Sequence, residues 1–207
     1  MNIIVQKYAG TSVGTIPKIK SVADRILRAK ATGAAMVVVV SAMGHTTDRL
    51  VNLARAITRK PSRREMDMLL STGEQISIVL LSLAIQERGA RAISMTGLQS
   101  GIVTDANYSM AKIKSVKTDG ILSQLETDHV VIVAGFQGVS QGLEITTLGR
   151  GGSDTTASAL AVALRARCCE IYTDVDGVFT ADPNLVPEAK QLQYISYEEM
   201  VELAGAG

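Results

Sequence analysis

The sequence has few aromatic residues and almost no net charge. Aromatic side chains make up 3% of the 207 residues, and tryptophan is absent, so the stacking platforms that bind single-stranded nucleic acid are not expected. The formal net charge is +1 at pH 7, which gives no electrostatic attraction for a polyanion. We therefore expect no nucleic-acid partner. A small anionic ligand is still allowed, because a few local cations are enough to hold one.

Long hydrophobic runs are also missing. The longest ones, such as Ala34 to Val40, are far too short to span a bilayer. The first residues lack the charged and apolar regions of a secretory signal. The sequence therefore predicts no membrane association and a cytoplasmic location.

Cysteine is scarce, and its placement is unusual. The two cysteines, Cys168 and Cys169, are neighbours, and neighbours rarely reach the geometry of a disulfide. We expect both to be reduced, buried side chains. With two histidines in the chain and no third cysteine, we expect no metal site built from protein ligands.

What is present is the balance of an ordinary globular domain, with 46% hydrophobic and 20% charged residues. Short apolar runs, several of them rich in β-branched residues, alternate with segments of helical periodicity. Strands are expected at 3–7, 36–40, 91–95, near 102 and 113, and at 130–134, 145–148 and 171–173. Helices are expected from 17, at 47–58, 75–87, 118–126 and 155–165, and after a capping box formed by Ser196 and Glu199.

This alternation predicts an α/β fold, a three-layer sandwich with a mainly parallel central sheet flanked by helices. We expect Ser71-Thr72-Gly73-Glu74 to interrupt an apolar stretch before the helix that begins at 75. In such sheets, ligands bind beyond the carboxyl ends of the strands. Polar, glycine-rich junctions follow residues 7, 40, 148 and 173.

These junctions have the composition of a phosphate-binding site. Lys7 and Arg150 are cations, and neighbouring glycines let backbone N–H groups approach an anion. The helix expected near Asp154 adds a partial positive charge. Neither the P-loop spacing nor Gly-x-Gly-x-x-Gly is present, so the two commonest phosphate motifs are excluded.

Each of these residues also has an ordinary structural interpretation. Lys7 can be a solvated strand end and Arg150 a surface loop residue, while Glu74 can be a charge in the first turn of a helix. Ser153 and Asp154 can simply cap the helix that follows them. The residues alone leave these alternatives open.

Taken in order, five motifs resemble the catalytic domain of the aspartate kinases, a branch of the amino acid kinase family. The resemblance runs over essentially the whole chain. Its motifs are 7–13, 41–44 with 46–48, 71–74, 149–154 and 172–183.

The resemblance implies ATP-dependent phosphorylation of the β-carboxylate of L-aspartate to 4-phospho-L-aspartate, the first step toward lysine, threonine and methionine. The nucleotide would be ATP with Mg²⁺, the metal being held mainly by the phosphates. A carboxylate is already ionised at neutral pH, so no general base is needed. Catalysis would then depend on aligning two anions and neutralising the transferring phosphoryl group.

The resemblance also implies a role for each matching residue. Lys7 would place a fixed positive charge at the transferring phosphoryl group, and Asp154 would orient that lysine. Arg150 would grip the α-carboxylate of aspartate through a bidentate guanidinium, and Glu74 would pair with the α-amino group. Thr47 and Gly151 would complete the aspartate site. The nucleotide side would include Lys7, Gly10, Ser12, Ser41, Ser153, Thr173, Asp174, Phe179 and Asp182.

The chain departs from the family pattern at several positions. Ala9 stands where a glycine is usual, and its methyl group matters only if the backbone there needs a positive φ. Asn184 replaces a common arginine, and Phe179 replaces a common tyrosine. The family also continues beyond residue 207 into further catalytic elements and regulatory domains.

We therefore expect residues 1–207 to be a single catalytic domain, shortened at its C-terminal end and without a regulatory domain. Apolar surface left uncovered would need a partner, so a homodimer, or a regulatory chain or domain, is left open. Two alternative functions remain. One is a related kinase with another acceptor, against which Glu74 and Arg150 argue. The other is a catalytically silent nucleotide-binding module, suggested by Ala9, Asn184 and the shortened end.

Overall fold

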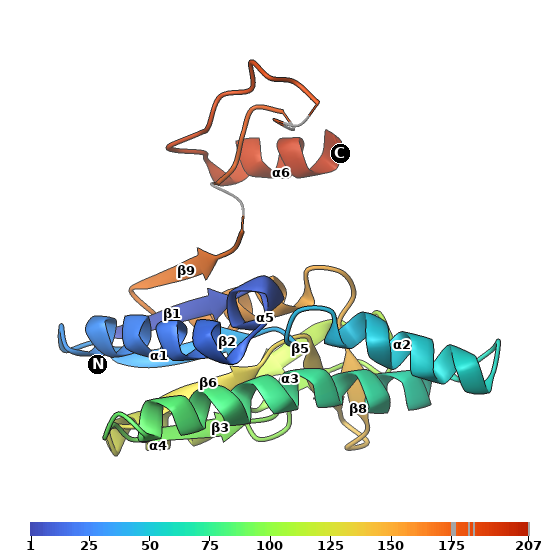
Figure 1. Ribbon diagram of the computed structural model, residues 1–207, viewed down its shortest axis with the longest axis horizontal. Coiled ribbons are helices and arrows are strands. Elements are labelled where there is room, and N and C mark those ends of the chain that lie inside the picture. Colours follow the sequence, from blue (N-terminus) through green and yellow to red (C-terminus); the bar gives the residue numbers. More distant parts are fainter. Residues whose placement is uncertain (175–176, 182, 184, 207) are drawn as a thin grey trace. The chain divides into compact units, whose positions relative to one another are not determined.

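The computed structural model describes residues 1–207 except 175, 176, 182, 184 and 207 (Figure 1). The chain divides into two compact units, Met1–Thr173 and Asp174–Gly207. The first unit contains two sheets and five α-helices, and it carries all of the pocket described below.

A five-stranded parallel sheet forms the centre of the first unit. Its strand order is β3-β6-β2-β1-β9, and all four neighbouring pairs are parallel. The valine run of β2 is buried on both sides, as expected for an inner strand of a parallel sheet. The strands are β1 (Ile3–Tyr8), β2 (Ala35–Val40), β3 (Ala92–Met95), β6 (Val130–Ala134) and β9 (Cys168–Tyr172).

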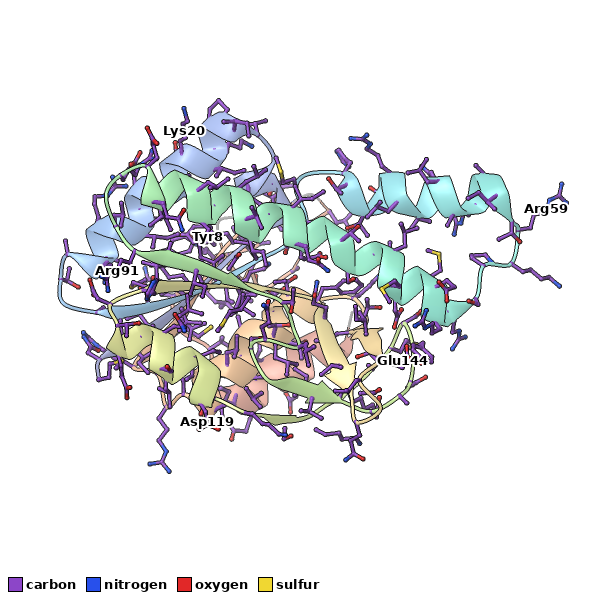
Figure 2. All side chains as sticks on the ribbon, turned by 90° about the horizontal axis from the view of Figure 1, so that it is seen from below. Tyr8, Lys20, Arg59, Arg91, Asp119 and Glu144 are labelled. Atoms are coloured by element: carbon purple, nitrogen blue, oxygen red, sulfur yellow. The ribbon has the colours of Figure 1, made fainter. Side chains whose placement is uncertain are left out.

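Helices cover both faces of this sheet. Alternate residues of β2 face opposite sides: Val38 packs with α1 (Ile16–Lys30) and α3 (Arg63–Gln86), and Val39 packs with α4 (Asp119–Glu126) and α5 (Gly152–Ala163). Figure 2 shows α1 and α3 on one side of the sheet and α4 on the other. The predicted three-layer α/β sandwich is confirmed.

A second, four-stranded sheet lies beside the central one, in the order β5-β4-β7-β8. One of its strands, β7, was not predicted, because the sequence Gln-Gly-Val-Ser has neither an apolar run nor a clear alternation. The junction after residue 148 follows β8, so it does not lie at the end of a central strand as the sequence suggested. The strands are β4 (Ile102–Thr104), β5 (Ile113–Val116), β7 (Gln137–Ser140) and β8 (Ile145–Thr147).

The prediction that Ser71 to Glu74 interrupt an apolar stretch before a helix that begins at 75 is wrong. These four residues lie inside the 24-residue helix α3. Gly73 occurs there for close packing and not for a turn: a Cβ added to it would lie 2.9 Å from the Cβ of Ala42. α3 packs against α2 (Thr46–Ile57). Arg59 lies in the connection between these two helices (Figure 2).

By length and composition α3 is also apolar enough to cross a membrane. Its inner face, however, packs in the core of the first unit. Five polar residues of α3 are buried: Asp67, Ser71, Glu74, Ser77 and Ser82. These are the features of a helix that packs in a protein core.

Both cysteines are free, but the prediction that they are buried is wrong. Cys168 is exposed and Cys169 is partly buried, because β9 is the edge strand of the central sheet. In the second unit the predicted capping box is confirmed. The Ser196 amide donates to Glu199, and the Glu199 amide donates to the Ser196 hydroxyl, at the start of α6 (Tyr197–Ala206).

Candidate active site

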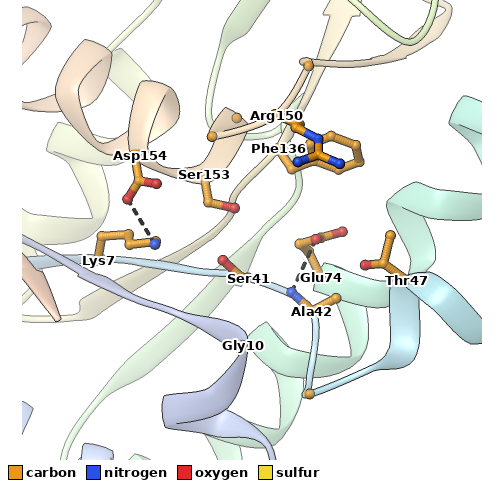
Figure 3. Close-up of a pocket in the computed structure, with 14 residues that line it drawn as sticks. Lys7, Gly10, Ser41, Ala42, Thr47, Glu74, Phe136, Arg150, Ser153 and Asp154 are labelled. Atoms are coloured by element: carbon orange, nitrogen blue, oxygen red, sulfur yellow. Dashed lines mark hydrogen bonds and ion pairs between the residues drawn. The ribbon is translucent and has the colours of Figure 1, made fainter. Parts of the chain in front are cut away.

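Segments that follow β1, β2, β6 and β8 meet α3 and the first turn of α5 around one pocket of about 300 Å³ (Figure 3). Most of the residues predicted for the site line this pocket. They are Lys7, Gly10, Ser41, Thr47, Glu74, Arg150, Gly151, Ser153 and Asp154. Residues that are far apart in the sequence therefore meet at one pocket.

Lys7 is a buried cation and not a solvated strand end. It lies near the end of β1 with 6% of its surface exposed, and its Nζ is 2.8 Å from Asp154 Oδ1. The contact is an ion pair and not an aligned hydrogen bond, since Asp154 Oδ1 has no hydrogen-bond partner among the described residues. An ammonium has three N–H donors, so one carboxylate leaves donor capacity for a ligand.

Glu74 is a buried carboxylate in the middle of α3, and the interpretation as a first-turn helix charge is wrong. It is 3% exposed, and its Oε1 accepts a hydrogen bond of 3.1 Å from the Ala42 amide. Within the described part of the chain, its Oε2 has no hydrogen-bond partner. Burial raises the pKa of Glu74 to about 7, against the lowering effect of backbone hydrogen bonds. A ligand ammonium would satisfy the second oxygen and favour the ionised form.

Arg150 is an exposed loop residue at the entrance of the pocket. Gly151, which follows it, has a φ of 71° and is the N-cap of α5, a conformation that favours glycine. The helix begins at Gly152 without a side-chain cap, so the capping interpretation of Ser153 and Asp154 is wrong. Both lie in the first turn, where the helix dipole favours an anion.

Two hydroxyl groups lie between the cation and the buried carboxylate. Figure 3 shows the side chains of Ser41 and Ser153 directed into the space between Lys7 and Glu74. Ser153 is fixed by close packing, because a Cβ on Gly135 would lie 2.6 Å from its Oγ. Hydroxyl donors at this place suit phosphate oxygens.

Backbone contact joins the turn after β1 to the loop after β2. A Cβ on Gly10 would lie 2.5 Å from the carbonyl oxygen of Ala42, and the Gly44 amide donates to the Gly10 carbonyl at 3.0 Å. Ala9, by contrast, has a φ of −67° and a ψ of 161°. Any residue adopts that conformation, so the alanine that departs from the family pattern fits its place.

Sequence reasoning missed Phe136, which lines the pocket. It lies between β6 and β7 with a φ of 66°, a strained conformation for an aromatic residue. Hydrogen bonds hold it there, since its amide donates to Thr156 Oγ1 and its carbonyl accepts from the Leu148 amide. The signal was available: Gly135 and Phe136 directly follow the strand 130–134, at the end of the sheet where ligands bind.

Two further predicted residues of the first unit, Ser12 and Thr173, do not line this pocket. Ser12 lies in the 3₁₀ helix Gly10–Val13, and Thr173 follows β9 at the end of the first unit. Asp174 and Phe179 belong to the second unit. Asp182, and Asn184 where an arginine is usual, lie outside the described residues. Among the residues that are described, no three His, Cys, Asp or Glu side chains are grouped to hold a metal ion.

The whole chain is similar to known proteins. The amino acid kinase family model matches residues 2–207. Aspartokinase 2 of Bacillus subtilis and the aspartokinase of Geobacillus stearothermophilus are each 58% identical to this chain over 207 residues. The match covers 100% of this chain and 51% of each relative, so the chain spans about half the length of these curated relatives.

Solved structures give the same result for the fold. Aspartate kinase from Synechocystis superposes with a TM-score of 0.86 at 55% identity, covering 99% of this chain and 34% of that one. E. coli aspartokinase III in complex with aspartate and ADP has a TM-score of 0.84 at 28% identity, covering 98% of this chain and 56% of that one.

Proposed function

Because this chain belongs to the amino acid kinase family, we propose that it transfers the γ-phosphoryl group of ATP to the β-carboxylate of L-aspartate. The observation that carries the proposal is the combination of charges in one pocket. Around about 300 Å³ of space lie two cations, Lys7 and Arg150, and the buried carboxylate of Glu74, while Asp154 also lines the pocket and is paired with Lys7. An amino acid with a second carboxylate has the complementary charges.

In this proposal, each of the three charged groups of aspartate lies beside a side chain of opposite charge. Arg150 pairs with the α-carboxylate, for which the guanidinium offers two parallel donors. Glu74 pairs with the α-ammonium through the oxygen that has no partner among the described residues. The β-carboxylate then extends toward Lys7, and Thr47 and Gly151 complete the acceptor site. E. coli aspartokinase III, a structural neighbour, was solved with aspartate and ADP.

The chemical step requires positioning and charge neutralisation. The β-carboxylate is the nucleophile and is ionised at neutral pH, so no residue has to remove a proton. As its oxygen bonds to the γ-phosphorus, the bond to the bridging oxygen breaks and ADP leaves. Lys7 neutralises the phosphoryl oxygens, Asp154 holds its Nζ in place, and the N-terminus of α5 adds a partial positive charge.

The nucleotide enters as its Mg²⁺ complex, with the metal bound mainly by phosphate oxygens. Gly10, Ser41 and Ser153 form the phosphate side of the pocket in this proposal. Ser12, Thr173, Asp174, Phe179 and Asp182 stay predictions for the nucleotide site. The proposed product, 4-phospho-L-aspartate, is the first intermediate toward lysine, threonine and methionine.

Further parts of the proposal concern the whole protein. We take residues 1–207 as one catalytic domain that contains no regulatory domain, and the cytoplasm as its location. A homodimer, or a regulatory chain or domain, stays a predicted partner. The silent-module alternative has lost one of its grounds, since the backbone of Ala9 does not need a glycine.

A panel of acceptors tests the proposal. ADP release with Mg²⁺ and ATP is measured with L-aspartate and with three analogues. Succinate and N-acetyl-L-aspartate lack the free ammonium, and β-alanine lacks the α-carboxylate. We expect turnover with L-aspartate and a large loss of kcat/KM with each analogue. A preference for N-acetyl-L-aspartate would replace aspartate by an acylated amino acid as the acceptor.

A further inference from the structure

Asp67 is a fully buried carboxyl group outside the pocket, with 0% of its surface exposed. It accepts four hydrogen bonds in the structure. Oδ2 accepts from the Ser109 amide at 2.9 Å and the Thr147 amide at 2.8 Å. Oδ1 accepts from the Ser109 hydroxyl at 3.1 Å and the Thr147 hydroxyl at 2.8 Å.

These bonds fasten α3 to β8, the strand that leads into the loop carrying Arg150. Thr147 is the last residue of β8, three positions before Arg150. Its carbonyl also accepts a hydrogen bond from the Ala111 amide. Ser109 has a φ of 69°, a strained conformation that surrounding bonds must hold. Asp67 therefore fixes the point from which the loop through Arg150 begins.

The same face of α3 contacts two other walls of the pocket. Asp67, Ser71 and Glu74 are spaced at i, i+4 and i+7, so they lie on one side of the helix. The Ser71 carbonyl accepts a hydrogen bond of 2.9 Å from Gln137 Nε2, next to Phe136, and Glu74 binds the Ala42 amide. One rigid helix thus holds the segments that carry Ala42, Phe136 and Arg150.

We propose that Asp67 is a positioning residue that sets the separation between Arg150 and Glu74, and with it which acceptor fits. Seven helical residues place Asp67 and Glu74 about 10 Å apart along the axis of α3. Arg150 is connected to α3 through Thr147, which is hydrogen-bonded to Asp67. Glu74 is itself a residue of α3. The spacing of the two groups that would read the α-carboxylate and α-ammonium is therefore fixed by one helix. The identity of the acceptor rests on the proposed function, whereas the positioning of the loop does not.

Four substitutions separate positioning from general stability. Asp67→Ala removes all four acceptor contacts. Asp67→Asn keeps a carbonyl for the two amides, and its NH₂ group can donate to the two hydroxyls, so it is the conservative rescue. Thr147→Val removes one hydroxyl and is informative even if Asp67→Ala does not fold. Thr104→Val is the matched control, because Thr104 is buried in the same sheet and its hydroxyl contacts Thr146.

Two readouts are taken on the chain. Amide NMR signals of Gly149, Gly151 and Gly152 without ligand report the position of the loop, and the KM values for L-aspartate and ATP report the site. We expect Thr147→Val and Asp67→Ala to move the loop signals and to raise the KM for aspartate roughly tenfold, leaving that for ATP nearly unchanged. Asp67→Asn and Thr104→Val should resemble the parent.

Unmoved loop signals in Thr147→Val and Asp67→Ala would overturn the proposal, as would equal changes in both KM values or an equal effect of Thr104→Val. If the parent chain shows no aspartate-dependent turnover, the proposed function fails on its own. The loop signals still decide the role of Asp67 in that case, because they require no substrate.

Discussion

Lys7 Nζ lies 2.8 Å from Asp154 Oδ1, which joins an inner strand of the parallel sheet to the first turn of α5. Neither residue makes a site alone. Together they place a buried ammonium at the N-terminus of a helix, where two sources of positive charge face one pocket (Figure 3). We propose that this charge serves the transfer of a phosphoryl group to aspartate.

Lys7→Ala removes the fixed charge. We expect kcat to fall at least about 100-fold, the loss typical of removing a preorganised charge-stabilising donor, with a much smaller change in the KM for aspartate. Lys30→Ala is the matched control, because Lys30 also pairs with an aspartate, Asp128, and does not line the pocket. Steady-state kinetics of both variants check this. An equal loss in the control would remove Lys7 from the mechanism.

Arg150→Lys keeps the charge but loses the planar pair of donors. We expect the KM for aspartate to rise roughly tenfold to a hundredfold, the range for a lost hydrogen bond to a charged group, while the KM for ATP changes little. Arg59→Lys, in the connection between α2 and α3, should behave as the parent. If the apparent affinities for both substrates fall together, Arg150 does not read the α-carboxylate.

Glu74 gives the activity a dependence on pH. Its pKa of about 7 in the free protein means that the ionised form, which binds the α-ammonium, is lost as the pH falls below 7. We expect kcat/KM for aspartate to decrease on that acidic side and the dependence to disappear in Glu74→Gln, at a lower overall value. A pH profile of both proteins tests this; a profile unaltered by the substitution would contradict the assignment.

The same carboxyl group makes folding stability depend on pH in the opposite sense. Because burial raises the pKa of Glu74 from its usual 4.5 to about 7, the protonated form is favoured in the folded state. That stabilisation is complete below about pH 4.5 and is lost as the pH rises through 7. Glu74→Gln should therefore stabilise the ligand-free chain by up to about 3 kcal/mol at pH 8, and by much less at pH 5. Denaturant unfolding at the two pH values, with the exposed Glu126→Gln as control, measures the difference.

Two adjacent residues, Ala9 and Gly10, should respond in opposite ways to the exchange of alanine and glycine. Gly10→Ala places a methyl group 2.5 Å from the Ala42 carbonyl oxygen, so we expect a loss of about 1–3 kcal/mol in stability and impaired turnover. Ala9→Gly fits the backbone and should cost only about 0.5–1 kcal/mol, with activity retained. Thermal unfolding and turnover of the two variants test this. A large loss of activity in Ala9→Gly would show that the methyl group is needed.

The sequence predicts those parts of the fold that depend on local patterns. The β-branched run of β2 and the strand at 130–134 were placed almost residue for residue, because both are buried on both faces. The apparent break at Ser71 to Glu74 could not be interpreted locally. Polar residues there are buried because Ala42 and Gln137 supply their partners from distant segments.

The candidate site, too, could be predicted only as far as local sequence patterns allow. The motifs around Lys7, Glu74 and Arg150 predicted residues that line one pocket in the structure, but local sequence alone left structural interpretations open for each. Only the fold shows that Lys7 and Glu74 are buried and that Ser153 and Asp154 do not cap α5. No sequence motif indicated the proposed positioning role of Asp67, because that role depends on hydrogen bonds to the distant residues Ser109 and Thr147.

Trapping of the product with hydroxylamine is the decisive experiment for phosphoryl transfer to the β-carboxylate of aspartate. The chain is incubated with ATP and Mg²⁺, with and without L-aspartate, and both ADP and aspartyl hydroxamate are measured, because an acyl phosphate reacts with hydroxylamine. We predict hydroxamate in equal amount to ADP, dependent on L-aspartate and formed at least about 100-fold more slowly by Lys7→Ala. ATP binding without any hydroxamate, or ADP release indifferent to aspartate, would contradict the proposal that this pocket phosphorylates the β-carboxylate.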